Sequence, residues 1–375
     1  MTAAPCERRR GDGRDARVIR LSSMLERSAR WAATHQAADG SLAPGHNGPW
    51  GDRETPLRNT GGWLLVFLWA YEHTGKTVYR RAAERAARYL MQEEHRPGKG
   101  AFVHQPDRGR LAGNGLVGQA WTLRSLLEAH RVLQWEELRE IAVGVARLHA
   151  FDEVLGLWSS LGVAGESLGV NTTLNQQIWF ASSVSLLASH DEGTRRKLRR
   201  FMDCLPSHVR SSPTGRIEHR IHPRSLWRRF PTGWRSYLTA SRHRGGTEEQ
   251  RSIGYHAFCL FGLGLLAPTQ VGGTLPRLAF VPRAMNYAES FEYRRGLEGN
   301  PFAYGYNPTG FEMAFALVCF LAGVEDKARS WVREQIRRSY DLRTGLMTRH
   351  SPDPPTLAAR IWEAMFLPDW EIDVA

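Results

Sequence analysis

Apolar positions recur along this chain at the three-to-four-residue spacing of amphipathic helices, and the predicted helices come in pairs. The first helix of a pair keeps a charged face, as in residues 78–93. The second is apolar around most of its circumference, as in residues 59–73 and 309–322. Because a helix that is apolar nearly all round is buried on most sides, the second helices are predicted to be inner and the first to be outer.

Six such pairs can be traced along the chain. They are residues 17–35 with 59–73, 78–93 with 115–133, 135–150 with 172–189, 194–205 with 252–266, 283–291 with 309–322, and 327–340 with 356–366. A polar cluster opens each inner helix, and the clusters begin at residues 59, 114, 171, 255, 307 and 360. Self-similarity at a period of about 50 residues indicates a ring or array of helical hairpins. We therefore expect an all-α fold, an (α/α)6 toroid or six-hairpin barrel, as a single catalytic domain over residues 17–370.

Parallel inner helices would bring the six polar clusters together at one end of the ring. Helix N-termini carry partial positive charge and unpaired N–H groups, which favour a bound carboxylate or phosphate. The clusters also contain good N-caps, so capping is the structural alternative for each of them. Capping does not explain the polar side chains that lie one or two turns inside an inner helix. A water-filled funnel would supply hydrogen-bond partners for these side chains. The candidate substrate-binding residues are Glu54, Asn59, Asn114, Gln119, Trp121, Asn175, Gln176, Trp179, Tyr255, Tyr304, Tyr306, Asn307 and Arg360.

Composition and charge limit which ligands, cofactors and cellular location can be expected. The formal charge is +12 and comes mostly from arginine, which raises only a mild expectation of anionic ligands. The four cysteines show no metal-ligand spacing, so no metal or other cofactor is expected and a cytoplasmic location is favoured. The longest apolar run, residues 253–267, is too short for a membrane span. Residues 1–16 read as a disordered basic arm without a signal peptide.

Three sequence runs carry a resemblance to a known group. They are ETPLRNTGGWLLVFLWAYEHTGKTVYRRAAERAARYL at 54–90, NGLVGQAWTLRSLLEAHRVL at 114–133 and NTTLNQQIWFASSVSLLA at 171–188. These runs resemble the AglQ-like proteins of archaeal glycosylation clusters and their bacterial relatives in surface-polysaccharide clusters. More distantly, the layout resembles unsaturated glucuronyl hydrolases and N-acylglucosamine 2-epimerases, which share the (α/α)6 fold. The resemblance implies glycan metabolism involving hexuronic acids.

The distant relatives differ from this chain at chemically important positions. The positions that match Asn59 and Asn114 carry aspartates in unsaturated glucuronyl hydrolases, and one of them protonates the sugar. An amide cannot act as a general acid, so that mechanism does not transfer as it stands. The 2-epimerases use paired histidines on inner helices, and here only His256 is placed comparably.

Glu312 and Glu363, on neighbouring inner helices, are the candidate catalytic acid and base, with His256 as the candidate for proton transfer near neutral pH. Asp52 and Glu54 are further carboxylates in the loop before the first inner helix. The alternative for the two glutamates is an internal ion pair with Arg58 or Arg360. Arg360 could instead clamp a uronate carboxylate.

An insertion at residues 210–251 accounts for the one long interval between clusters. It contains ten arginines interleaved with aromatic residues. We interpret it as a lid or an acidic-glycan groove, with a merely solvated loop as the alternative. Stacking on single-stranded nucleic acid is disfavoured, because no nucleic-acid-binding motif accompanies it.

The sequence thus predicts a carbohydrate-active enzyme of glycan or surface-polysaccharide metabolism that acts on an anionic, uronic-acid-type sugar. Glycosidic-bond cleavage by acid and base carboxylates is the preferred reaction. Sugar epimerisation or isomerisation, and a non-catalytic glycan-binding role, are the alternatives. The partner in each case is a glycan or sugar, and the sequence does not fix the oligomeric state.

Overall fold

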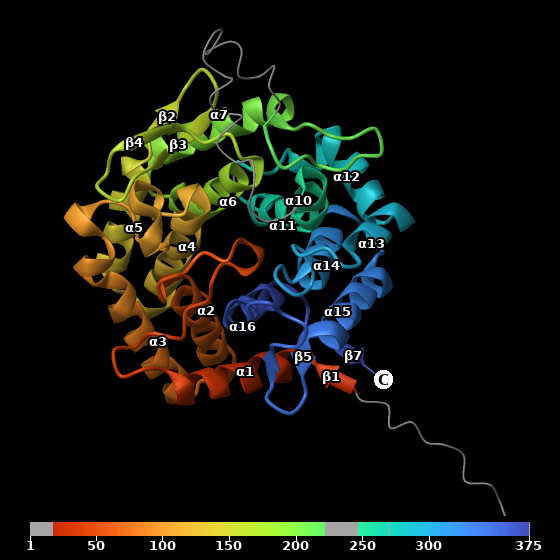
Figure 1. Cartoon of the computed structure of the whole chain (residues 1–375), viewed down its shortest axis with the longest axis horizontal. Helices are drawn as coiled ribbons and strands as arrows, with labels where there is room; N and C mark the ends of the chain where they lie inside the picture. The colour runs from red at the N-terminus through yellow and green to blue at the C-terminus, as the bar shows by residue number, and fades with distance from the viewer. Residues whose placement is uncertain (1–17, 222–246, 270, 375) are drawn as a thin grey trace, which may run out of the picture.

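The computed structural model describes residues 18–221, 247–269 and 271–374. Its helices form a ring in which an inner circle is surrounded by an outer one (Figure 1), which confirms the predicted (α/α)6 toroid. The inner helices are α2 (Leu57–Thr74), α4 (Gly115–Leu133), α6 (Leu174–Val184), α11 (His256–Leu266), α14 (Thr309–Phe320) and α16 (Pro354–Ala359) with its 3-10 continuation Arg360–Phe366. The outer helices are α1 (Leu21–His35), α3 (Thr77–Met91), α5 (Glu136–Leu148), α7 (Glu192–His208), α12 (Phe280–Ala288) and α15 (Glu325–Ser339).

The apolar faces explain this division into two circles. Every residue of α11 is buried, whereas α15 keeps its buried positions to one side and its charged residues toward solvent. Glycines allow the helices to approach closely where the circles meet. A Cβ on Gly310 in α14 would lie 2.3 Å from the carbonyl oxygen of Trp331 in α15. A side chain at position 310 would therefore push the outer helix away.

Several elements differ from the sequence prediction. The predicted helix 252–266 is two helices, α10 (Glu248–Gly254) and α11, because the backbone leaves helical geometry at Tyr255. Helix α12 begins three residues earlier than predicted and is followed by α13 (Phe291–Leu297), which is capped by the hydroxyl of Ser290. The predicted arm at 1–16 and the centre of the predicted insertion, residues 222–246, lie outside the described residues.

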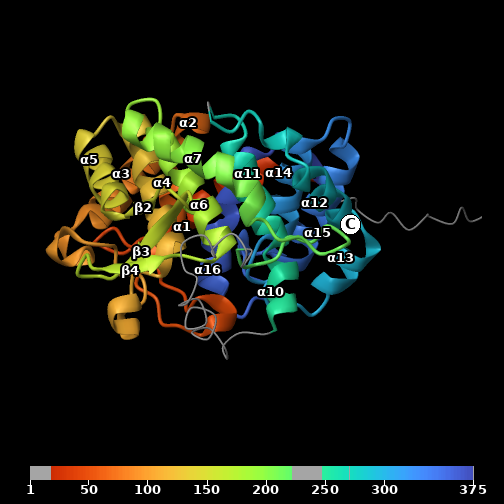
Figure 2. The same ribbon diagram turned by 90° about the horizontal axis from the view of Figure 1, so that it is seen from above.

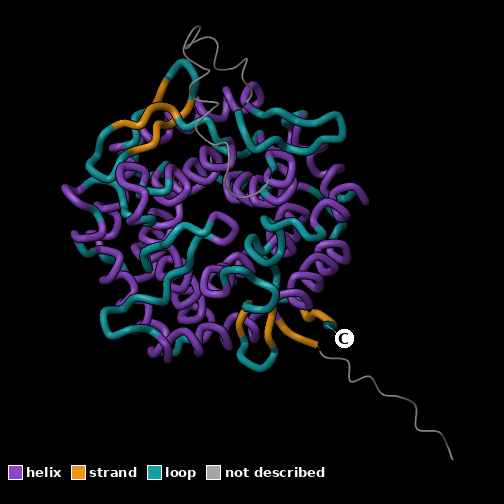
Figure 3. Tube along the Cα trace, viewed as in Figure 1, coloured by secondary structure: helices purple, strands orange, loops and turns teal. Residues whose placement is uncertain are grey.

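Short strands, which the helical pattern did not predict, lie at the edge of the ring (Figure 3). Strand β1 (Val18–Arg20) pairs antiparallel with β7 (Glu371–Asp373) and so joins the two ends of the described chain. Strands β2 (Phe151–Asp152), β3 (Leu157–Leu161) and β4 (Ser167–Val170) form a three-stranded sheet between α5 and α6. Strands β5 (Tyr340–Asp341) and β6 (Leu346–Met347) form a hairpin after α15.

The connections that lead into the inner helices gather at one face of the ring. Figure 2 shows the loop before α2 and helix α10 at this same face. In Figure 1 the loop before α2 reaches inward over the middle of the ring. Deeper in the ring, aromatic side chains fill the space between inner helices, as where Trp179 stacks on Phe258 with ring centres 4.4 Å apart. Within the described residues, no helix is long and apolar enough to cross a membrane.

Candidate functional site

A pocket of about 240 Å³ lies where the inner helices begin. Side chains from the starts of α2, α4, α6 and α11 line it, together with one from α10 and others from the loops between the pairs, including the segment just before α14. The lining comprises Asn47, Trp50, Asp52, Arg58, Gln105, Arg108, Asn114, Val117, Trp121, Thr173, Asn175, Gln176, His219, Arg220, Arg251, Tyr255, Phe258, Tyr306 and Asn307. Converging helix N-termini make this end of the ring favourable for a negatively charged ligand.

The pocket is cationic. Four arginines line it, and Asp52 is the one carboxylate in its described lining. Residues 222–246, which lie outside the described part of the chain, contain neither aspartate nor glutamate in their sequence. Asp52 is engaged by Arg108, whose Nη1 lies 2.9 Å from Oδ1. A ligand that brings its own negative charge is therefore better matched to this pocket than a neutral one.

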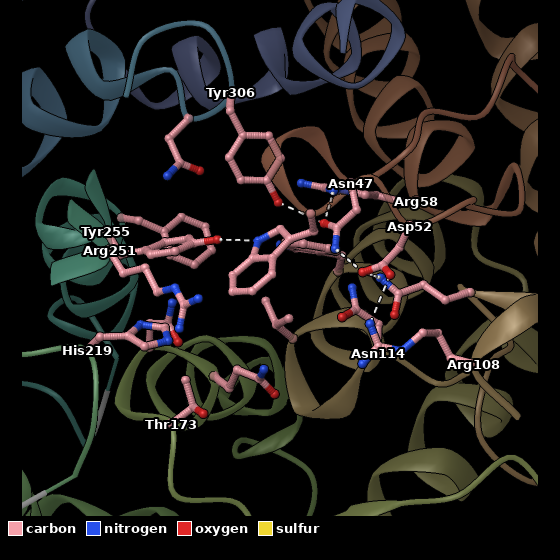
Figure 4. Close-up of a pocket in the computed structure, with 18 of the residues that line it drawn as sticks. Asn47, Asp52, Arg58, Arg108, Asn114, Thr173, His219, Arg251, Tyr255 and Tyr306 are labelled. Atoms are coloured by element: carbon pink, nitrogen blue, oxygen red, sulfur yellow. Dashed lines mark hydrogen bonds and ion pairs between the residues drawn. The ribbon is translucent and has the colours of Figure 1, made fainter. Parts of the chain in front are cut away.

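On one side of the pocket, Asn47 is the centre of a hydrogen-bond network (Figure 4). Its Oδ1 accepts from the hydroxyl of Tyr306 at 2.8 Å and from Nη1 of Arg58 at 3.2 Å. Asn47 has φ of 60°, in the left-handed region that asparagine tolerates better than most residues. The guanidinium of Arg58 lies 4.0 Å from the ring centre of Trp121 and forms a buried ion pair with Glu54 at 3.3 Å.

The opposite side of the pocket is built around His219 and Tyr255 (Figure 4). Their rings stack with centres 5.2 Å apart, and Nε1 of Trp50 donates to the Tyr255 hydroxyl at 3.1 Å. The guanidinium of Arg251 lies 4.8 Å from the Trp50 ring centre. Arg220 and Arg251 share the carboxylate of Glu248, each at 3.8 Å. The lining on this side thus contributes two guanidinium groups, which share one partly exposed carboxylate.

His219 is held in its neutral form. Burial lowers the pKa of its imidazole to about 3, and the charges of Arg220 and Arg251 act in the same direction. Its Nδ1 is buried without a hydrogen-bond partner among the described residues. A neutral imidazole can accept a proton, and an anion bound beside the two arginines would raise its proton affinity.

Seven of the predicted substrate-binding residues line this pocket. They are Asn114, Trp121, Asn175, Gln176, Tyr255, Tyr306 and Asn307. Some of these side chains also support the fold, as the capping alternative anticipated. The Oε1 of Gln176 accepts from the backbone N–H of Leu116 at 3.0 Å and so satisfies a donor at the start of α4.

Other predicted binding residues lie away from the lining. Gln119 is buried and bonds both backbone groups of Phe102, at 2.8 and 3.0 Å. Trp179 belongs to the aromatic core between α6 and α11. Asn59 donates to the carbonyl of Ala43 at 2.9 Å. The remaining three are Glu54, which pairs with Arg58, Tyr304, which lines a neighbouring pocket, and Arg360, which lines a small cavity beneath the pocket.

The three catalytic candidates are also outside the lining. Glu312 and Glu363 have no exposed surface, and their Oε1 atoms lie 2.7 and 2.6 Å from the same nitrogen, Nη2 of Arg360. This is the internal ion pair that was the structural alternative. Burial raises the pKa of both carboxyl groups, that of Glu363 to about 7.

His256 is likewise buried. Its Nδ1 accepts from the backbone N–H of Ile217 at 3.2 Å, and its Nε2 lies 3.0 Å from the carbonyl oxygen of Ala284. Burial lowers the pKa of its imidazole to about 4. His256 thus links α11 to α12 and to the segment around Ile217, with both ring nitrogens occupied.

The sequence prediction did not identify several residues that line the pocket, chiefly Asn47, Trp50, Arg108, Arg220 and His219. All of them lie in connections rather than in inner helices. A usable indication existed for two of them, because His219 and Arg220 belong to the basic insertion 210–251, which was interpreted as an acidic-glycan groove or lid. No such indication marked Asn47, Trp50 or Arg108.

The fold and the position of this pocket define the class, a six-hairpin toroid of the kind found in sugar isomerases, epimerases and glycoside hydrolases. D-mannose isomerase superposes with a TM-score of 0.61 at 13% identity, covering 92% of this chain and 95% of that one. Cellobiose 2-epimerase from Bacillus thermoamylovorans superposes with a TM-score of 0.59 at 14% identity, covering 92% of this chain and 98% of that one. An unsaturated glucuronyl hydrolase specific for heparin superposes with a TM-score of 0.58 at 11% identity, covering 92% of this chain and 95% of that one. These likenesses concern the fold.

The sequence itself assigns the family. The chain is 36% identical to archaeal glycosylation protein Q of Haloferax volcanii over 369 residues, which cover 94% of this chain and 98% of that protein. This chain therefore belongs to the family of archaeal glycosylation protein Q, which confirms the resemblance predicted from the sequence. No protein-family profile matches the chain.

Proposed function

We propose that this protein is a sugar epimerase or isomerase that acts on a uronic-acid-type sugar of a glycan pathway. The observation that carries the proposal is the neutral imidazole of His219 beside Arg220 and Arg251 in the pocket lining. The arginines would hold the carboxylate of the sugar, and His219 would accept a proton from the carbon next to the carboxylate or carbonyl group.

The electrons released from the C–H bond move onto the adjacent carboxylate or carbonyl oxygen, where Arg220 and Arg251 stabilise the added negative charge. The proton then returns, either to the same carbon from the other side or to a neighbouring atom. Tyr306 lies across the pocket from His219 (Figure 4), and its hydroxyl group is positioned to deliver a proton from that side. Atoms are conserved, and no oxidant or cofactor enters the reaction.

Glycosidic-bond cleavage by two carboxylates finds less support in the geometry. Cleavage by an acid and a base needs two carboxyl groups on either side of the scissile bond. The described lining holds Asp52 alone, while Glu312 and Glu363 are bonded to Arg360 below the pocket. The names of two structural neighbours, D-mannose isomerase and cellobiose 2-epimerase, are also in keeping with proton transfer on a sugar.

The test is incubation with free hexuronates and uronate oligosaccharides in deuterated buffer, followed by NMR and mass spectrometry. We expect deuterium in uncleaved sugar, and we expect His219→Gln to lower exchange by about 100-fold or more. His190→Gln, on an exposed position far from the pocket, is the matched control. Shortened oligosaccharides would instead establish a hydrolase. Saturable sugar binding without exchange or cleavage would establish a glycan-binding protein.

A further inference from the structure

A second, smaller cavity lies directly beneath the pocket. It has a volume of about 20 Å³ and is enclosed by inner helices α2, α4 and α16 with its 3-10 continuation. Arg58 and Trp121 line both this cavity and the pocket above it. The space suffices for a water molecule or a monatomic ion and is too small for a sugar.

Three arginines line this cavity, namely Arg58, Arg124 and Arg360, and each is at least nine-tenths buried. Two of them have donor groups that no described residue satisfies. Nη2 of Arg58 and Nε of Arg124 are buried without a hydrogen-bond partner in the described part of the chain. Buried N–H groups of a guanidinium are costly to leave unpaired, so the cavity calls for an acceptor.

The charges around the cavity decide which acceptor fits best. Arg58 is paired with Glu54 at 3.3 Å. Arg124 donates from Nη2 to the carbonyl of Ser182 at 2.8 Å, and no ion pair between described residues involves it. Glu128, one turn further along α4, is engaged at 2.9 Å by Arg131, which also binds Glu72 at 2.7 Å. Arg124 is thus a buried cation whose described hydrogen bond goes to a neutral carbonyl, while Glu128 acts on it only by charge attraction.

The carboxyl groups beside Arg360 do not carry a surplus negative charge that could offset the positive charge of Arg124. Glu312 and Glu363 both approach Nη2 of Arg360, at 2.7 and 2.6 Å, with no exposed surface. Two buried carboxyl groups this close cannot both ionise readily, so the pair holds one proton between them. The raised pKa values of both groups agree with this. The triad is then neutral, so the three arginines that line the cavity carry one net positive charge together with the carboxyl groups bonded to them.

We propose that this cavity is a binding site for a monatomic anion, chloride, held by Arg58 and Arg124. An anion supplies the acceptor that the unsatisfied N–H groups need and neutralises the excess charge at the same time. A water molecule would supply the hydrogen-bond acceptor but would not neutralise the charge. The proposal is independent of which sugar occupies the pocket above.

The direct test uses the full-length protein crystallised in sodium bromide instead of sodium chloride. Bromide is a larger halide with strong anomalous scattering, and we expect an anomalous difference peak in the cavity between the side chains of Arg58 and Arg124. A cavity with ordered density but no anomalous peak would identify water and overturn the proposal, whether or not the protein acts on sugars.

The second test follows thermal unfolding without sugar, in sodium chloride and in sodium methanesulfonate at equal ionic strength. Methanesulfonate is too large for the cavity, so we expect a saturable rise in Tm of about 3 °C or more in chloride only. Arg124→Met should abolish the chloride dependence. Arg131→Met, on the same helix but with its side chain 56% exposed, should keep it. Equal Tm values for the unmodified protein in both salts would also overturn the proposal.

Discussion

His219 stacks on Tyr255 with ring centres 5.2 Å apart and an interplanar angle of 24°. The stack fixes the imidazole in the pocket wall beside Arg220 and Arg251, whose charges help burial to lower the pKa of His219 to about 3. Anion binding at these arginines is therefore coupled to the proton affinity of the histidine.

Binding of glucuronate should raise the pKa of His219. The carboxylate offsets the repulsion from Arg220 and Arg251, and an upward change of about one pH unit or more is expected. The measurement is an NMR titration of the imidazole signals with and without saturating glucuronate, with the His219→Gln spectrum to assign the signal. An unchanged pKa at saturation would mean that the carboxylate binds elsewhere in the pocket.

Arg251→Met should weaken binding of glucuronate by about 10- to 100-fold, as the loss of a hydrogen bond to a charged group typically does. Binding of glucose should change little, because it lacks the carboxylate. Isothermal titration calorimetry with both sugars measures the difference. Arg277→Met, at an exposed position outside the pocket lining, is the control and should leave both affinities unchanged. An equal loss of affinity for both sugars would show that Arg251 does not recognise the carboxylate.

Glu363→Gln should change how stability depends on pH. The folded state raises the pKa of Glu363 from 4.5 to about 7, so between these values the folded protein binds more protons than the unfolded chain. This contribution is present below pH 4.5 and is lost as the pH rises to 7. The free energy of unfolding of the unmodified protein should therefore fall relative to Glu363→Gln by about 3 kcal/mol across this window.

Urea unfolding of both proteins at several pH values measures this difference, and titrating groups that do not interact with Glu363 cancel because both proteins contain them. A difference that stays constant with pH would show that Glu363 is not protonated in the folded protein.

Asp353→Ala should loosen the loop that presents Asn47, although Asp353 does not line the pocket. The Oδ2 of Asp353 accepts from the backbone N–H groups of His46 and Gly48, at 3.0 and 2.9 Å. Removing this acceptor should cost about 1–3 kcal/mol of stability and weaken sugar binding, as measured by thermal unfolding and calorimetry. Asp326→Ala, on the exposed face of α15, is the control. Unchanged sugar affinity would assign Asp353 a purely structural role.

The helices were largely predictable because their apolar periodicity is local. The predicted range 115–133 coincides with α4. The break at Tyr255 was missed, because the nearly continuous apolar run 253–267 reads as part of one helix. The strands β1 and β7 pair residues from opposite ends of the chain, and their short sequences carry no strand periodicity of their own.

The candidate site was predictable in part. The amides and aromatic residues at the starts of inner helices were found because parallel helices place them at one end of the ring, and Asn114, Asn175 and Tyr306 line the pocket. Residues in the connections were missed, because nothing local shows whether a loop folds over the ring or away from it. Asn47 is held at the pocket by distant residues, among them Asp353, which binds the backbone on either side of it.

The sequence by itself determined the six helical pairs, the family and the end of the ring where polar groups meet, because each follows from local periodicity or from matched residues. The tertiary structure decided which charged groups face the pocket and which neutralise one another below it. Arg360 could have served a sugar carboxylate as well as Glu312 and Glu363 on sequence alone. In the structure Arg360 is buried between the two glutamates and pairs with both of them. Sequence periodicity could not show this, since ion pairing depends on distances that periodicity does not contain.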